Sequence, residues 1–147
     1  MEVLLRAATA ADSDFCYALH EAALGPYVTA VWGWDEAVQR GFHERGFDPS
    51  KIKIIMVNGR EAGRLDVERR PDGIFLGLIE LLPAYQGRGV GGRLVRDLIA
   101  EAAARGQPLS LEVLVVNVRA HALYTRLGFR ETGRDEVKVR MRIEVHR

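Results

Sequence analysis

The sequence predicts an α+β domain with a mixed, mostly antiparallel central sheet of six or seven strands and about four flanking helices. Three observations support this fold class. Residues after Lys51 alternate between apolar and polar, which is typical of half-buried strands. The apolar run 74–82 leads into a glycine-rich loop. Apolar residues then recur at the spacing of one helical face before a second apolar run, which is the order of a crossover between parallel strands.

The elements before the sheet's central part are predicted from local signals. Val3 to Arg6 is expected to form a first strand. Thr9, with Asp12 three residues later, resembles the start of a helix, and Gly25-Pro26 is expected to end that helix. Asp35 is expected to cap a second helix that ends near Gly46.

The remaining elements follow in order. Asn58-Gly59 predicts a hairpin turn, with the return strand over 61–69 and a further turn at 71–73 before the strand over 74–82. A helix over 91–105 is expected to cross to a parallel strand over 109–116. A short helix over 119–126 precedes a hairpin, whose last strand alternates apolar residues up to Val145.

The loop over 86–92 is predicted to bind a phosphate group. A strand, a glycine turn and a helix start present unpaired backbone N–H groups at the positive end of the helix dipole. No lysine follows the glycines, so the nucleotide loop G-x-x-x-x-G-K-[ST] is absent. Gly87, Gly89 and Gly92 satisfy G-x-G-x-x-G, but Glu112 lies inside an apolar run and too few elements follow for a dinucleotide-binding fold.

Two motifs resemble those of the GNAT acyltransferase superfamily. Gln86-Gly87-Arg88-Gly89-Val90-Gly91 resembles its [QR]-x-x-G-x-[GA] loop, and residues 111–129 resemble L-E-V…N-x-x-A-x-x-L-Y-x-x-L-G-F. The resemblance implies acetyl transfer from acetyl-CoA to a primary amine by direct attack. It also implies that the two parallel strands diverge around the coenzyme. The expected coenzyme-binding residues are Leu81, Leu82, Gln86, Gly87, Arg88, Gly89, Val90, Gly91, Gly92, Asn117 and Tyr124, with Arg93 as a further cation.

Two carboxylates are candidates for the base that deprotonates the amine. Period-2 alternation places Glu112 and Glu80 among apolar neighbours in central strands, where burial tends to raise a carboxyl pKa. Glu112 is preferred because it matches L-E-V, and a structural ion pair is the alternative for either residue. By resemblance, Tyr124 is the donor to the leaving thiolate, or else a packing residue. Asn117 either contacts the coenzyme or caps the following helix.

The aromatic residues Tyr27, Trp32 and Trp34 are candidates for the wall of the acceptor pocket. The part of the chain that holds them commonly covers the acceptor substrate in the resembling family. Indoles also serve to seat helices on a sheet, and the sequence leaves both interpretations open.

Composition limits the other functions. With 147 residues, a formal charge of +1 and one cysteine, the sequence favours a single cytoplasmic domain without disulfides and without a nucleic-acid or membrane partner. The histidines at 20, 43, 121 and 146 show no metal-ligand spacing, so no metal is expected. A non-catalytic acyl-CoA-binding sensor is the alternative function. A homodimer through exposed strand edges and the identity of the amine stay open.

Overall fold

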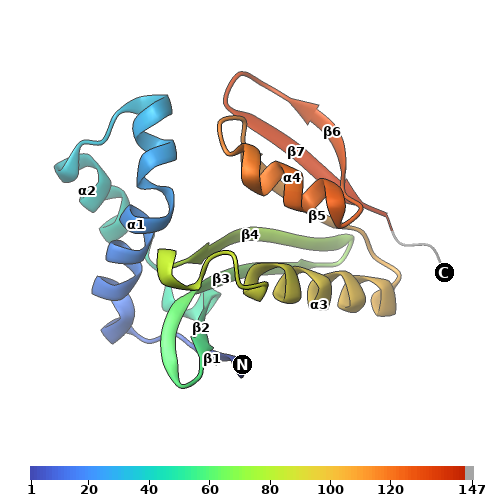
Figure 1. Cartoon of the computed structure of the whole chain (residues 1–147), viewed down its shortest axis with the longest axis horizontal. Coiled ribbons are helices and arrows are strands. Elements are labelled where there is room, and N and C mark those ends of the chain that lie inside the picture. The colour runs from blue at the N-terminus through green and yellow to red at the C-terminus, as the bar shows by residue number, and fades with distance from the viewer. Residues whose placement is uncertain (145–147) are drawn as a thin grey trace. The chain divides into compact units, whose positions relative to one another are not determined.

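The computed structural model describes residues 1–144, and Figure 1 shows the path of the chain through its elements. The strands and α-helices among these residues are β1 Val3–Ala7, α1 Ser13–Trp32, α2 Glu36–Gly46, β2 Ile52–Val57, β3 Arg60–Arg70, β4 Gly73–Leu81, α3 Val90–Arg105, β5 Leu109–Leu114, α4 Val118–Arg126, β6 Arg130–Arg134 and β7 Lys138–Ile143. Short 3-10 turns cover Ala10–Asp12, Pro49–Lys51 and Pro83–Tyr85.

The strands form a seven-stranded sheet in the order β1-β2-β3-β4-β5-β7-β6. Strands β4 and β5 are parallel, in the register Ile74↔Leu109 to Leu76↔Leu111. The pairs β1–β2, β2–β3, β5–β7 and β6–β7 are antiparallel. The predicted fold class is therefore confirmed, including the parallel pair of β4 and β5. The divergence of β4 and β5 beyond Leu76 stays a prediction.

The chain divides into two compact units, each with its own buried residues. Unit 1 comprises Met1–Asp66 and Leu78–Arg88, and unit 2 comprises Val67–Gly77 and the chain from Gly89 onward. In unit 1, Phe15, Phe47 and Met56 pack against a buried cluster of Cys16, Ile52 and Ile54. In unit 2, the buried side chains include Leu94, Val95, Leu98, Leu109, Leu111 and Met141. That the two units form one domain is still a prediction.

Helix α1 does not end at Gly25-Pro26, so that expectation is wrong. Pro26 lies inside the helix, which ends at Gly33, where φ is 77° and the N–H donates to the Thr29 carbonyl at 3.0 Å. A proline in a helix interior removes one hydrogen bond and costs about 3 kcal/mol. The buried face of α1 nevertheless continues past Pro26 to Val28. Packing of that face outweighs the local signal, because burial supplies most helix stability in folded proteins.

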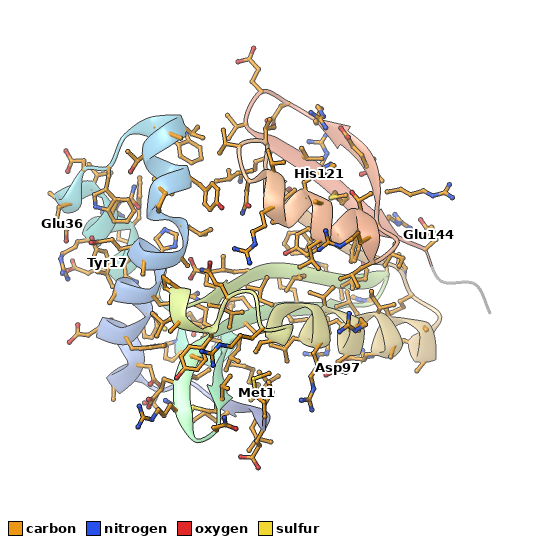
Figure 2. All side chains as sticks on the ribbon, in the orientation of Figure 1. Met1, Tyr17, Glu36, Asp97, His121 and Glu144 are labelled. Carbon is orange, nitrogen blue, oxygen red and sulfur yellow. The ribbon has the colours of Figure 1, made fainter. Side chains whose placement is uncertain are left out.

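Helices α1 and α2 contact each other through Tyr17, which Figure 2 labels on α1 together with Glu36 on α2. The Tyr17 ring meets the His43 ring edge-on, with ring centroids 5.5 Å apart. The Arg40 guanidinium carbon lies 4.2 Å from the centroid of the Tyr17 ring. Asp35 caps α2 as predicted, because its carboxylate accepts from the Val38 N–H at 3.0 Å. These contacts fix α2 against α1 within unit 1.

Several other predicted elements are confirmed, with small shifts at their ends. Asn58 and Gly59 form the hairpin turn with φ of 50° and 79°, as an Asn-Gly turn requires. Gly106 ends α3 with φ of 64°. Strand β5 ends at Leu114 and not at Val116. Val145 lies outside the described residues.

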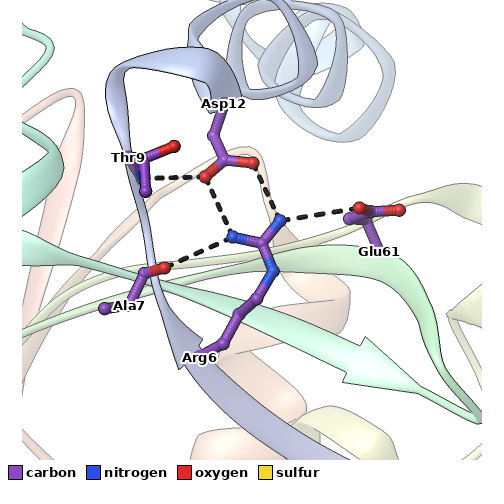
Figure 3. Close-up of polar contacts among 5 residues, drawn as sticks. All are labelled: Arg6, Ala7, Thr9, Asp12 and Glu61. Atoms are coloured by element: carbon purple, nitrogen blue, oxygen red, sulfur yellow. Dashed lines mark hydrogen bonds and ion pairs between the residues drawn. The ribbon is translucent and has the colours of Figure 1, made fainter.

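An ion-pair network joins β1 to the start of α1 (Figure 3). Arg6 donates to the two oxygens of Asp12 at 2.8 and 3.0 Å, and the Thr9 N–H donates to Asp12 at 2.8 Å. The Arg6 hydrogen bonds are the main reason why the pKa of Asp12 falls to about 2. Glu61 lies 3.5 Å from the same guanidinium. Asp12, which the sequence predicts at the start of the helix, therefore also pairs with Arg6 of strand β1.

None of the helices within residues 1–144 combines the length and the apolar character that crossing a membrane requires.

Replacing Asp12 with Ala should lower the free energy of unfolding by about 1–2 kcal/mol at pH 7, the loss expected for a helix cap and a partly buried ion pair. The pKa of Asp12 is lowered on folding, so its contribution is complete above the ordinary value of 3.8 and disappears as the pH falls through about 2. Urea unfolding at pH 7 and pH 3 measures both effects. The matched control is Asp14→Ala, at an exposed position two residues on. An equal penalty for Asp12→Ala at both pH values would contradict the assignment.

Candidate active site

The loop from Gln86 to Gly91 has the backbone conformation that an anion-binding turn needs. Gly87 and Gly89 have φ of 73° and 82°, a region that side-chain-bearing residues rarely adopt. Gly89 is the N-cap residue of α3, and within residues 1–144 there is no side-chain cap for the first turn of the helix. The first-turn N–H groups are therefore left for another acceptor. A Cβ built on Gly89 would meet nothing within 4 Å, so there is open space beside the loop.

Hydrogen bonds within unit 1 hold the end of β4 and the start of the loop. Gln86 donates its side-chain amide to the Leu81 carbonyl at 2.9 Å, which ties the loop back to the end of β4. The Leu82 N–H donates to the Ala62 carbonyl at 2.8 Å. The Arg88 guanidinium carbon lies 6.0 Å from the centroid of the Tyr85 ring. Arg93 on α3 is exposed.

Asn117 caps helix α4. Its side-chain oxygen accepts from the Ala120 N–H at 3.2 Å, and its own N–H donates to the Leu114 carbonyl at 2.9 Å. The capping interpretation of the sequence is thus confirmed. The coenzyme contact expected from the resemblance stays a prediction, which the side-chain N–H₂ group could still serve.

Tyr124 on α4 is buried, and its ring meets Phe129 in a T-shaped contact with centroids 5.7 Å apart. Burial raises the pKa of the hydroxyl to about 12, because the phenolate would lose its hydration. The group is therefore protonated throughout the physiological range. It can donate a hydrogen bond but is a weaker acid than an exposed tyrosine.

Glu112 does not have the apolar environment that the sequence predicts. On β5 the buried residues are Leu109, Leu111 and Val113, and Glu112 occupies the other face. Its side chain is 41% exposed, and its Oε2 lies 3.6 Å from the Lys138 ammonium nitrogen on the neighbouring strand β7. Alternation correctly gives the two faces of the strand, but it does not say which face is covered. The expected burial is therefore wrong, and the catalytic role is untested.

Glu80 is buried as expected, and it pairs with His20, for which the sequence predicts no role at the site. The Glu80 side chain is fully buried, and its Oε2 lies 2.7 Å from Nδ1 of His20 on α1. Its second oxygen, Oε1, is buried and has no hydrogen-bond partner within residues 1–144. His20 directly follows the apolar residue Leu19, which is buried on α1. A position next to a buried residue is the one sign in the sequence that His20 could lie at the core. It does not reveal a partner 60 residues away.

Gly63 on β3 permits the close approach that positions Glu80. A Cβ at this residue would lie 2.0 Å from the Glu80 carbonyl oxygen, which no side chain can accommodate. A bulge in the β2–β3 pairing lies beside it, where the register shifts between Ile55 and Met56. Any side chain at residue 63 would displace the β4 backbone at Glu80.

The three aromatic candidates for the acceptor wall have different surroundings. Trp34 is half-buried, its ring centroid is 6.2 Å from that of His20, and its Nε1–H donates to Glu36 at 3.1 Å. Trp32 is 60% exposed at the end of α1, and Tyr27 is half-buried on the same helix. The structure brings only Trp34 next to the His20–Glu80 pair. An acceptor role for any of the three stays a prediction.

Comparison with known families decides the class of protein. The family described as FR47-like protein matches residues 61–140, more than half of the chain. The chain belongs to this family of GNAT N-acetyltransferases. The matched residues contain Glu80, the 86–92 loop, Glu112, Asn117 and Tyr124. His20 and the aromatic candidates precede the match, so the family places no constraint on them.

The relatives of this FR47-like chain agree with that assignment. A segment of 51 residues is 51% identical to N-alpha-acetyltransferase RimI of Mycobacterium tuberculosis, and it covers 35% of this chain and 31% of that protein. The match thus spans about a third of the relative's length.

Two solved structures share the fold. PaiA N-acetyltransferase from Thermoplasma acidophilum, in complex with coenzyme A, has a TM-score of 0.79 and 13% identity, over 98% of this chain and 99% of that one. The ribosomal-protein-S18-alanine N-acetyltransferase from Escherichia coli has a TM-score of 0.70 and 24% identity, over 99% of this chain and 96% of that one. At these identities the likeness establishes the fold alone.

Proposed function

We propose that this protein transfers an acetyl group from acetyl-CoA to a primary amine by direct attack of the amine on the thioester. The observation that carries the proposal is the 86–92 loop, which has two left-handed glycines and a helix start without a side-chain cap, in a chain that belongs to the GNAT family. The coenzyme supplies the activated acetyl group. The residues of this chain bind it, orient it and move protons.

The residues present fit a diphosphate. Among the described residues the first turn of α3 has no side-chain cap, and open space lies where a Gly89 Cβ would project. Arg88 and Arg93 would add positive charge to the phosphates. Leu81, Leu82 and Asn117 would contact the arm of the coenzyme, as the resemblance implies.

The acceptor amine must lose a proton before it attacks. An alkylamine with a pKa near 10.4 is neutral in about one molecule in 2,500 at pH 7, a deficit of about 4–5 kcal/mol. A carboxylate base recovers part of this deficit. Glu112 has the motif position for that role, whereas Glu80 has the buried position and an oxygen free to accept. Both remain candidates.

Tyr124 would stabilise the departing thiolate. A hydroxyl with a pKa of about 12 stays protonated, but full proton transfer to a thiolate of pKa near 8.5 is uphill by about 5 kcal/mol. Its role is therefore that of a hydrogen-bond donor to the sulfur as charge develops there.

A non-catalytic coenzyme sensor would need only the loop. The buried, half-paired carboxylate of Glu80 supports the enzyme, because leaving a buried oxygen without a donor is costly and a bare binding module gains nothing from it. The names of the relatives include an N-alpha-acetyltransferase, so a protein's terminal amine is one acceptor to test. With a pKa near 8, that amine is neutral in about one molecule in ten at pH 7 and depends less on a base. A cytoplasmic location and a homodimer stay predictions.

The protein should release the thiol of coenzyme A from acetyl-CoA when it is assayed with a panel of alkylamines, amino acids, polyamines, aminoglycosides and peptides. Gly89→Val should weaken acetyl-CoA binding at least about tenfold by calorimetry, because the left-handed backbone is costly for a β-branched residue. Gly46→Ala, which adds a Cβ in open space at an ordinary φ, is the control. Unchanged affinity in Gly89→Val would remove the loop assignment. Coenzyme binding without turnover on any amine would favour the sensor.

Changing Tyr124 to Phe should lower kcat about 10- to 100-fold with little effect on KM, since one hydrogen bond to a charged sulfur contributes about 1.5–3 kcal/mol. The ring contact with Phe129 is kept, so the melting temperature should not fall. Steady-state kinetics with the best amine measure the effect. Wild-type turnover in the variant would show that the hydroxyl is idle.

Glu112→Gln and Glu80→Gln separate the two candidate bases. The variant that loses the base should lose the acidic limb of the profile of kcat/KM against pH, because no carboxylate remains to be protonated there. The sequence-based preference predicts this for Glu112. Loss of the limb in Glu80→Gln alone would show that the preference was wrong. Lys138→Ala, which removes the ammonium beside Glu112, is a control for indirect charge effects at that residue.

A further inference from the structure

The pair of Glu80 and His20 joins a buried carboxylate to a partly exposed imidazole. The Glu80 side chain is fully buried, while the His20 side chain is 32% exposed. When Glu80 is ionised it can only accept hydrogen bonds, so the 2.7 Å contact places a proton on Nδ1 of His20. The imidazole therefore holds one carboxylate oxygen in place and faces solvent with the rest of its ring.

The other oxygen of Glu80 has no partner. Buried carboxylate oxygens normally accept hydrogen bonds, and one left unpaired costs about 1–3 kcal/mol or more. Oε1 is buried with no donor within the described part of the chain. The protein thus leaves this oxygen without a donor, and the N–H of a primary ammonium group is complementary to a carboxylate oxygen in charge and in hydrogen bonding.

The titratable groups near Glu80 and His20 in unit 1 do not fill this position. Arg64 on β3 is near enough to sense the charge of Glu80, but its guanidinium is bound by two hydrogen bonds to Asp66, at 2.6 and 3.0 Å. Burial raises the pKa of the Cys16 thiol on α1, so that group is neutral. Burial lowers the pKa of His43 on α2, which also favours its neutral form. Within residues 1–144, His20 is the one residue whose side chain bonds directly to the carboxylate.

Trp34 provides an aromatic face beside the pair. Its ring is held by the hydrogen bond from Nε1 to Glu36, and a Cβ on Gly25 of α1 would lie 3.8 Å from it. The ring centroids of Trp34 and His20 are 6.2 Å apart. An indole face attracts an alkylammonium group through its π-electrons. Carboxylate, imidazole and indole thus lie together in unit 1.

We propose that Glu80, His20 and Trp34 bind the ammonium group of the acceptor, with His20 as the positioning residue that holds Oε2 and leaves Oε1 to take the amine's proton. The inference deepens the proposed acetyl transfer and rests on it. In the step, one ammonium proton moves to Oε1, giving a neutral amine and a carboxylic acid. The nitrogen lone pair forms the C–N bond as the C–S bond breaks. After the attack the nitrogen loses a second proton, which balances the negative charge of the thiolate. Glu80 then returns its proton to solvent.

Two substitutions of His20 test the positioning role. His20→Asn retains an amide N–H near the place of Nδ1 and should keep kcat within about threefold, whereas His20→Leu should lower it about 10- to 100-fold, as expected when a hydrogen bond to a charged group is lost. The acidic limb of the pH profile should move in the Leu variant only. Arg64, Asp66, His43 and Cys16 are unchanged in both variants, so their charges cancel in the comparison. Equal losses in Asn and Leu, or an unmoved profile in Leu, would overturn the proposal.

A binding measurement without the coenzyme separates this inference from the acetyl-transfer proposal. Propylammonium at millimolar concentrations should shift the ring ¹⁵N resonances of His20 in the wild type and not in Glu80→Gln. Propyltrimethylammonium carries the same charge without an N–H, and it should shift them much less if the hydrogen bond to Oε1 is what binds. No shift with propylammonium, or equal shifts with both cations, would overturn the site. A specific shift in a protein that fails to bind acetyl-CoA would refute the acetyl-transfer proposal and leave the amine site standing.

Discussion

The buried Glu80 carboxylate constrains how strands and helix α1 pack in unit 1. A carboxylate removed from water needs hydrogen bonds or charge to offset its lost hydration, and this one has a single direct partner. Its position follows from the close passage of β3, which only a glycine at residue 63 allows. The partner comes from α1, so the placement of that helix on the sheet and the state of the carboxylate depend on each other.

The 86–92 loop, by contrast, depends on backbone conformation and not on a buried charge. It requires no buried charge, only two residues free to adopt positive φ and a helix start with no side-chain cap. Such a loop offers backbone donors whatever its side chains are. Under the proposed function, the backbone of this loop would bind the donor substrate, whereas binding of the acceptor would depend on side chains.

Sequence reasoning succeeded where the signal is local. The Asn58-Gly59 turn, the glycine loop and the Asp35 cap each depend on residues within a few positions, and all have the predicted conformation. It failed where packing decides. Pro26 is tolerated inside α1 because the buried face continues beyond it, and Glu112 is exposed because alternation identifies two faces without telling which is covered. The partnership of His20 with Glu80 joins residues 60 positions apart, which no periodicity in one sequence can reveal.

The contact between Trp34 and His20 gives the protein a built-in optical reporter. Trp34 is half-buried beside the His20 ring, so a molecule that binds next to that ring would change the surroundings of the indole. Trp32, the other tryptophan, is largely exposed and would contribute a red-shifted background. The blue part of the emission spectrum should therefore report binding beside His20 in the unlabelled protein.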